Sequence, residues 1–295
     1  MKFRTVIETK KAPFLLEATR PTLFIGSCFS DNIGNKMVRS MSPASVNPCG
    51  VQYNPGSIAS LIETCTSGAK ELSPDIFFPH ENLWKCWLLP SRFAAVEKDD
   101  ALQKAREAFK LLSDNLKEAQ AVAITFGTAY VYEHIGSELS PFSGIVGNCH
   151  KVPAKEFTHR MLSVDEITTR WKSVIAQIRH INPEIKIIYT VSPVRHLNPS
   201  PRLNTLSKAT LHLAVDELVK HDADTSYYFP AWELLMDDLR DYRFYADDMC
   251  HPSDKAIDYI WERFCETFYS ESERQILAEG ERKQRRLNHR PILTT

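Results

Sequence analysis

The chain has 295 residues, and its 36 Lys and Arg against 37 Asp and Glu give a formal net charge of −1. This balance gives no reason to expect a nucleic-acid partner or binding to an anionic membrane. A composition of 43% hydrophobic and 25% charged residues excludes a disordered or fibrous chain.

The cysteines and the apolar segments indicate the cellular compartment of the protein. Seven cysteines are scattered without a C-x-x-C pair, which weakens zinc-ribbon and thioredoxin-type interpretations. No segment has the roughly 18 consecutive apolar residues that a membrane span needs. The N-terminal segment also lacks the apolar core of a secretory signal. We therefore expect a cytoplasmic protein that needs no membrane.

The first half of the chain predicts three strands, three helices and one less regular segment. The strands are predicted at residues 22–25, 44–46 and 121–126, and the helices at 31–41, 57–65 and 100–116. Residues 75–96, rich in Phe, Trp and Leu, predict a hairpin or flap.

The second half continues the alternation of strands and helices. Ser163-Val-Asp-Glu166 is a capping box, which predicts the start of a helix that runs to about Ile181. The further strands are predicted at 185–191 and 226–229, and the further helices at 203–220, 231–240 and from 253 onward. From about residue 282 the chain is polar and basic, which is typical of a solvated terminus.

Short strands separated by helices are typical of a parallel sheet that is covered on both faces. We therefore predict one domain over residues 1–295, an α/β protein with a three-layer α/β/α sandwich and a mainly parallel central sheet. In such a sheet, ligands bind beyond the carboxyl ends of the strands.

A serine follows the first predicted strand, in the segment Gly26-Ser27-Cys28-Phe29-Ser30. At a strand-to-helix turn the Ser27 hydroxyl would be exposed, and its N–H would point from a helix N-terminus toward an oxyanion. A serine that merely caps the helix is the other interpretation.

An acid and a histidine stand three residues apart near the other end of the chain, in Asp248-Met249-Cys250-His251. A neutral histidine can take the proton of a serine hydroxyl when a carboxylate orients its ring. Asp247 competes with Asp248 for this role, and a capping or salt-bridging acid is the alternative. Ser27 and His251 together favour nucleophilic catalysis.

The sequence resembles the GSCFA family, whose name is its G-S-C-F-A motif and which is similar to the SGNH or GDSL hydrolases. Ser30 stands where the family has the final Ala. The resemblance rests on six segments in the family's order, which are 26–30, 50–55, 126–132, 148–151, 192–196 and 241–252.

The resemblance implies a flavodoxin-like fold of the SGNH hydrolase type with Ser27 as the nucleophile. It implies His251 as the general base and Asp248 as the acid that orients it. It also implies that the N–H groups of Ser27 and Gly50 form an oxyanion hole.

One departure from the SGNH pattern concerns that oxyanion hole. SGNH enzymes carry G-x-N-D after the third strand, and the Asn amide is a third donor. Here Ala129 stands in the place of that Asn, and a methyl group cannot donate a hydrogen bond. Asn148 is the preferred replacement, with Thr128 as the other candidate.

Other polar residues near the predicted strand ends are candidates for substrate binding. They are Thr128, His150, Arg195 and His196, with a structural salt bridge at Arg195 and a loop hydrogen bond at His150 as the alternatives. A Cys28 nucleophile, a Cys149–His150 pair and a metal site of His150, His196 and His251 are weaker alternatives.

These observations predict a serine hydrolase that cleaves carboxylic esters of small molecules or carbohydrates through an acyl-enzyme and requires no cofactor. O-acetyl groups on a carbohydrate are one candidate substrate. A catalytically weak ligand-binding protein on the same frame and an acyltransferase are the alternatives.

Overall fold

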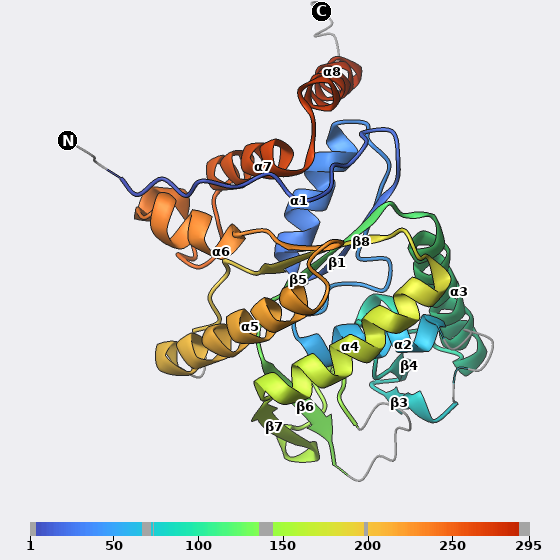
Figure 1. Cartoon of the computed structure of the whole chain (residues 1–295). Coiled ribbons are helices and arrows are strands. Elements are labelled where there is room, and N and C mark those ends of the chain that lie inside the picture. Colours follow the sequence, from blue (N-terminus) through green and yellow to red (C-terminus); the bar gives the residue numbers. More distant parts are fainter. Residues whose placement is uncertain (1–3, 67–71, 73, 136–143, 198–199, 289–295) are drawn as a thin grey trace, which may run out of the picture.

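A five-stranded parallel sheet forms the centre of the computed structural model, which describes residues 4–66, 72, 74–135, 144–197 and 200–288 (Figure 1). The sheet consists of β1 (Thr22–Gly26), β2 (Ala44–Val46), β5 (Ala121–Phe126), β8 (Lys186–Val191) and β9 (Ser226–Tyr228). Their order across the sheet is β2-β1-β5-β8-β9, and every neighbouring pair is parallel. This is the strand order of the flavodoxin-like folds.

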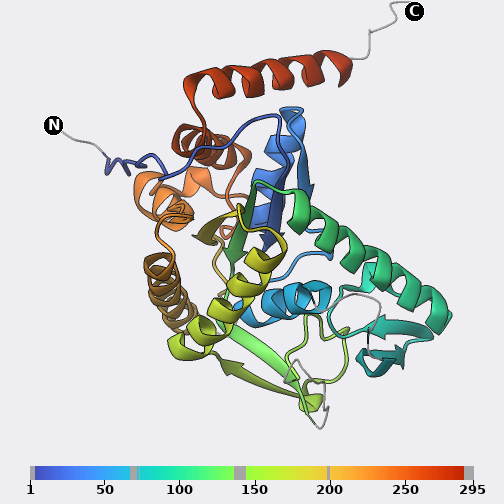
Figure 2. The ribbon, with the colours of Figure 1, turned by 45° about the vertical axis from the view of Figure 1, so that its right-hand side comes forward.

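Helices cover both faces of the sheet, which confirms the predicted three-layer α/β/α sandwich (Figures 1 and 2). On one face, α2 (Pro55–Thr66), α3 (Lys98–Glu118), α4 (Val164–Ile181) and α5 (Pro201–His221) pack on side chains such as Leu23 and Ile124. On the other, α1 (Cys28–Arg39), α6 (Ala231–Glu233) and α7 (Asp254–Phe268) pack on Phe24 and Ala123. Successive strand residues point to opposite faces, so the side chains of one sheet contribute to two apolar cores.

Two antiparallel hairpins lie at the end of the molecule opposite the C-terminal helix α8 (Glu271–Asn288) (Figures 1 and 2). β3 (Phe77–His80) pairs with β4 (Leu83–Cys86), which confirms the hairpin predicted within residues 75–96. β6 (Tyr130–His134) pairs with β7 (Phe157–Met161) and was not predicted. The described residues also contain four single-turn 3₁₀ helices, at Pro74–Ile76, Ser91–Phe93, Ala154–Glu156 and Tyr242–Phe244.

Two predicted segments differ from the structure. The predicted helix 231–240 is only one α-helical turn, α6, followed by a π-helix at Leu234–Asp238. The basic segment from about 282 continues α8 as far as Asn288, and residues 289–295 lie outside the described residues. Leu277 is the one buried side chain of α8, so most of this helix lies on the surface.

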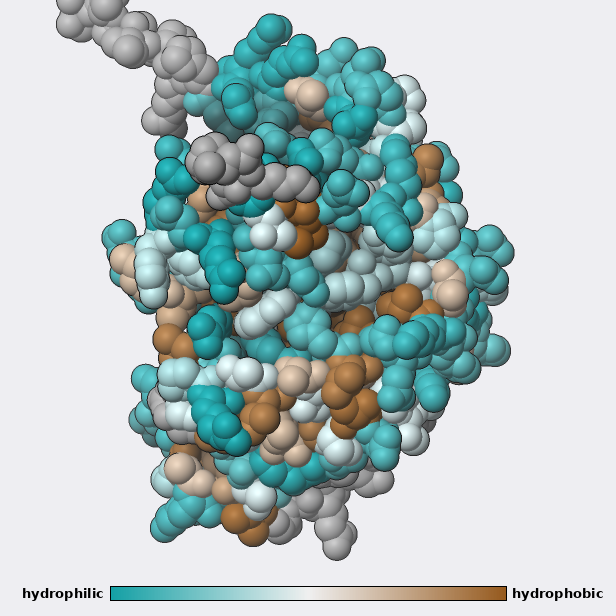
Figure 3. All heavy atoms as spheres, turned by 60° about the vertical axis from the view of Figure 1, so that its left-hand side comes forward, coloured by the Kyte–Doolittle hydropathy of each residue, from teal (hydrophilic) through white to brown (hydrophobic). Residues whose placement is uncertain are grey.

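The surface agrees with a protein that packs its apolar residues inside. The side on which α5 and α6 lie is mostly hydrophilic, with apolar residues scattered between polar ones (Figure 3). Of the helices in the described part of the chain, none combines the length and apolar character that a bilayer crossing requires.

Candidate active site

The order of the strands reverses between β1 and β5, because β2 lies on one side of β1 and all later strands lie on the other. The chain therefore leaves β1 and β5 in opposite directions and opens a crevice at their carboxyl ends. Ser27 follows β1 directly, and Gly127 follows β5. The structure thus brings two predicted segments, about 100 residues apart in sequence, to the point where this fold class binds ligands.

Ser27 forms the turn between β1 and α1. It is the N-cap of α1, and its Oγ accepts a hydrogen bond from the Phe29 N–H at 3.3 Å. Gly26, with a φ of 141°, allows the turn, since a Cβ there would lie 2.3 Å from Thr125 O. The close approach of β1 and β5 therefore requires glycine before the serine. The hydroxyl of Ser27 lies at the positive end of the α1 dipole.

Asp248 and His251 form a tight pair in the turn before α7. Asp248 Oδ1 accepts the N–H groups of Cys250 and His251, both at 2.9 Å, and Oδ2 lies 2.5 Å from His251 Nδ1. These hydrogen bonds, those from the backbone first, lower the pKa of Asp248 to about 2. Asp248, rather than Asp247, holds the ring. Because Nδ1 faces the carboxylate, Nε2 is the nitrogen left for a substrate or a hydroxyl.

A cavity of about 730 Å³ connects these segments. Its lining includes the predicted residues Thr128, Asn148, His150, Arg195, His196 and His251. Cys28, the residue after Ser27, also lines it, together with an aromatic group from β6 and β7. A volume of this size is typical of a small-molecule site, for which the usual range is about 300–1,000 Å³.

Ser27 itself is 1% exposed and does not line this cavity, although the next residue, Cys28, does. Within the described residues, Ser27 Oγ makes no hydrogen bond to His251, and its side-chain interaction is the cap with Phe29 N–H. Catalytic hydrogen bonds are often long before substrate binds and shorten in the complex. The site thus contains an oriented histidine on the cavity and a buried serine next to the lining residue Cys28, without a hydrogen bond between them.

The sequence pattern of the GSCFA family matches residues 21–264, which include β1, the Ser27 turn and the Asp248–His251 turn. The chain belongs to the GSCFA family. A comparison with curated proteins finds no match.

Among solved structures, the GSCFA chain is similar to a family 3 carbohydrate esterase from Clostridium thermocellum, with a TM-score of 0.39, 10% identity and coverage of 88% of this chain and 98% of the other. A family 3 carbohydrate esterase from Talaromyces cellulolyticus gives a TM-score of 0.40, 8% identity and coverage of 88% and 99%. A family two carbohydrate esterase from Clostridium thermocellum, in complex with cellohexaose, gives a TM-score of 0.36 and 14% identity, and the match covers 91% of this chain and 65% of the other.

The geometry of this GSCFA chain does not support an oxyanion role for Gly50. Its N–H donates to Asn47 O at 2.8 Å, and Gly50 does not line the cavity. Its φ is 86°, and a Cβ there would lie 2.4 Å from the Pro90 side chain. Gly50 is therefore a turn residue that allows close packing. The Ser27 N–H points at Thr125 O, at the long distance of 3.4 Å.

The two predicted replacements for the missing amide differ in the structure. Thr128 Oγ1 lies 3.1 Å from Ser207 Oγ and accepts the Tyr130 N–H, so Thr128 holds the loop after β5. Asn148 Oδ1 accepts the His150 N–H at 2.7 Å, and among the described residues its amide nitrogen has no hydrogen-bond partner. Asn148 can donate into the cavity, whereas Thr128 already has partners.

The predicted substrate-binding residues also separate into two kinds. Burial lowers the pKa of His150, whose ring nitrogens contact Cys86 O at 2.8 Å and Ser91 Oγ at 3.1 Å, so this ring holds its loop. Arg195 has a weak hydrogen bond to Asn204 Oδ1 at 3.5 Å and, in the described ranges, no carboxylate partner. Arg195 therefore remains able to bind an anionic or polar group of a ligand.

The cysteines near the cavity have the properties of unreactive thiols. Burial raises the pKa of Cys28, and burial raises that of Cys149 to about 11. Cys149 makes no hydrogen bond to its neighbour His150 in the described structure. Over the same described residues, no group of three His, Cys, Asp or Glu side chains gathers in a metal-binding arrangement.

Lys208, which none of the motifs contains, is a buried neighbour of the site. Its Nζ donates to Gly127 O and Ser192 O, both at 2.6 Å, and so connects the segments that follow β5 and β8. The sequence does carry a signal for it. Lys208 falls on the buried stripe of α5 with Leu211 and Val215, where a lysine is unusual.

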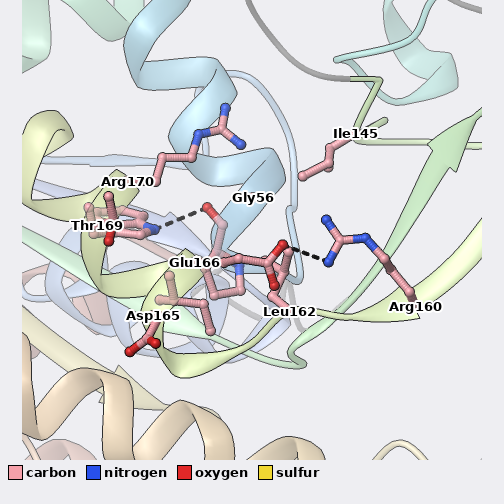
Figure 4. Close-up of a pocket in the computed structure, with 11 residues that line it drawn as sticks. Gly56, Ile145, Arg160, Leu162, Asp165, Glu166, Thr169 and Arg170 are labelled. Atoms are coloured by element: carbon pink, nitrogen blue, oxygen red, sulfur yellow. Dashed lines mark hydrogen bonds and ion pairs between the residues drawn. The ribbon is translucent and has the colours of Figure 1, made fainter.

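A second cavity of about 460 Å³ lies between α2, α4 and β7 (Figure 4). Three of its charged groups have ion-pair partners, since Arg160 pairs with Glu166 at 2.8 Å and Arg170 pairs with Glu63 at 2.6 Å. Figure 4 shows Arg160 and Glu166 pointing toward each other. Since His251 does not line it, this cavity is separate from the candidate site.

Proposed function

We propose that this GSCFA protein is a serine hydrolase that cleaves carboxylic esters, with Ser27 as nucleophile, His251 as general base and Asp248 as orienting acid. The observation that carries the proposal is the Asp248–His251 pair on the cavity that Cys28, the neighbour of Ser27, also lines. The membership of the GSCFA family supports the same assignment.

The chemistry follows from the hydrogen bonds of the two side chains. Ser27 Oγ acts as an acceptor in the helix cap, which leaves its proton available to His251 Nε2. As Oγ bonds to the ester carbon, His251 takes this proton and later gives it to the leaving alcohol. Water then attacks the acyl-enzyme, again with His251 as base, and Ser27 regains its proton. Asp248 stabilises the charged imidazolium in both steps.

The cavity supports a carbohydrate ester as the substrate, with O-acetyl groups as the leading candidate. Tyr132 and His159 are stacked, with ring centroids 4.3 Å apart, and both line the cavity with Tyr130. Tyr132 is 42% exposed, so part of its ring is open to a ligand. Aromatic rings beside polar donors can stack on the apolar face of a sugar.

An ester assay tests the proposal. We expect wild type to hydrolyse p-nitrophenyl acetate and Ser27→Ala to lose at least about 10³-fold in kcat/KM, since the nucleophile is removed. Cys28→Ala is the matched control at the next residue and should retain its activity. Equal turnover by wild type and Ser27→Ala would contradict the assignment of Ser27.

One observation favours a second candidate function, a catalytically weak ligand-binding protein. Ala129 is fully buried, and its N–H donates to Ser207 Oγ at 2.7 Å, so this residue offers a ligand no donor. A fluorophosphonate probe separates the candidates, because only an activated serine is labelled. If turnover occurs, product analysis with an added alcohol separates hydrolysis from acyl transfer.

A further inference from the structure

We infer that His196 supplies the oxyanion-hole donor that Ala129 lacks, through its Nε2–H. This inference rests on the proposed function, because it assigns a role in the same reaction. It concerns a side chain that lies outside the Ser27 and Asp248–His251 motifs and reaches the site from the loop after β8.

His196 lies close to Ser27 across Gly127. If Gly127 had a Cβ, this atom would lie 3.5 Å from His196 Nε2 and 3.4 Å from Ser27 Cβ. Ser27 Cβ and His196 Nε2 are therefore at most about 7 Å apart. In a tetrahedral intermediate on Ser27 the oxyanion is two bonds beyond Oγ, and a donor should lie about 2.7–3.1 Å from it. His196 Nε2 is within the reach that this geometry requires.

The nitrogen in question has no other function in the fold. His196 Nε2 is buried and has no hydrogen-bond partner among the described residues. A buried polar atom without a partner costs about 1–3 kcal/mol and calls for an explanation. The competing donors are less suitable, since Thr128 Oγ1 contacts Ser207 and the Gly50 N–H is bonded to Asn47.

Asn148 is the remaining competitor, because its amide nitrogen is also without a partner in the described chain. Its side-chain Oδ1 accepts a hydrogen bond from the His150 N–H. The N–H groups of Gly147 and Asn148 donate to Trp87 O, which anchors this loop. His196 instead lies against Gly127, the first residue of the block in which the third donor is missing. The position of the ring therefore favours His196.

Burial, more than the charges around it, keeps the His196 ring neutral. Burial, with Lys208 and His251 as further causes, lowers the pKa of His196 to about 4. At neutral pH the ring carries a single N–H, and a neutral imidazole can donate this proton to an oxyanion. The edge of the ring packs at 84° to Tyr53, with centroids 5.8 Å apart, which limits its rotation.

The test compares His196→Phe, which keeps the ring and removes the donor, with His196→Gln, which restores an N–H at a similar position. We expect His196→Phe to lose about 10²–10³-fold in kcat on p-nitrophenyl acetate with little change in KM, as for other oxyanion donors. His196→Gln should recover about tenfold of that loss. His221→Phe, an exposed position at the end of α5, is the matched control.

A boronic acid gives a second readout, since it forms a tetrahedral adduct with an active serine. Phenylboronic acid should inhibit His196→Phe about 10²-fold more weakly than wild type, and in wild type the adduct should shift the His196 Nε2 resonance. A folded His196→Phe with wild-type kcat overturns the inference, as does an unshifted Nε2 resonance if this variant does not fold. If wild type has no Ser27-dependent turnover, the proposed function fails first and the inference falls with it.

Discussion

Lys208 is a buried cation, and we expect its replacement to change how the stability of the protein depends on pH. Its side chain is 2% exposed, and no carboxylate in the described part of the chain forms an ion pair with it. Two carbonyl oxygens and the ring of Trp232, 5.2 Å away, surround Nζ instead. Burial, opposed by Cys28 and assisted by Arg195, lowers the pKa of Lys208 to about 7.

The sign of the effect follows from this lowered pKa. In the unfolded chain Lys208 has its ordinary pKa of 10.5, so between pH 7 and 10.5 the unfolded state binds a proton that the folded state has released. The free energy of unfolding therefore rises with pH in this window, and below pH 7 the cost of the buried charge is present in full. From pH 6 to pH 9 the rise amounts to about 2–3 kcal/mol.

Urea unfolding of wild type and Lys208→Met at pH 6, 7, 8 and 9 measures this contribution. Other titrating groups are common to both proteins, so the difference between their free energies of unfolding isolates Lys208. From pH 6 to pH 9 we expect the free energy of unfolding of wild type to rise by about 2–3 kcal/mol relative to that of Lys208→Met. Val215→Ala, a buried change on the same helix, should give a constant difference. A constant difference for Lys208→Met would refute the reasoning.

Two further substitutions test the geometry of the site. Asp248→Asn should lower kcat on p-nitrophenyl acetate by about 10²–10⁴-fold, because His251 Nδ1 loses its carboxylate. A similar loss of kcat in Asp247→Asn but not in Asp248→Asn would assign the orienting role to Asp247. Gly127→Ala should lower kcat/KM at least about tenfold with a small change in Tm, because its methyl group would lie between Ser27 and His196, only 3.0 Å from Tyr53 O. Unchanged kinetics in a folded Gly127→Ala would show that this space is not used.

The parts of the fold that the sequence predicted are those with a local cause. Four of the five strands coincide with short apolar runs, β2 coincides with the short further strand predicted at 44–46, and the Ser163–Glu166 capping box begins α4 as predicted. The Asp248–His251 contact spans three residues, so the spacing alone was enough to suggest it. In each case neighbouring residues determine the conformation, which a single sequence records.

The parts that were missed depend on contacts between distant residues. The role implied for the Gly50 N–H fails because Asn47, with a φ of 43°, turns its carbonyl toward that donor. The β6–β7 hairpin was missed because its strands are separated by more than 20 residues. The approach of His196 to Gly127 depends on the packing of the loops after β5 and β8. No local pattern encodes these contacts.

The most direct test of the central claim is to locate a covalent adduct. We predict that a fluorophosphonate probe adds one label to wild type, that peptide mass spectrometry places it on Ser27, and that His251→Ala abolishes it. Because Cys28 is adjacent and lines the cavity, the assay must resolve these two residues. A label on Cys28, or no label on a folded wild-type protein, would contradict the account of Ser27 as an activated nucleophile.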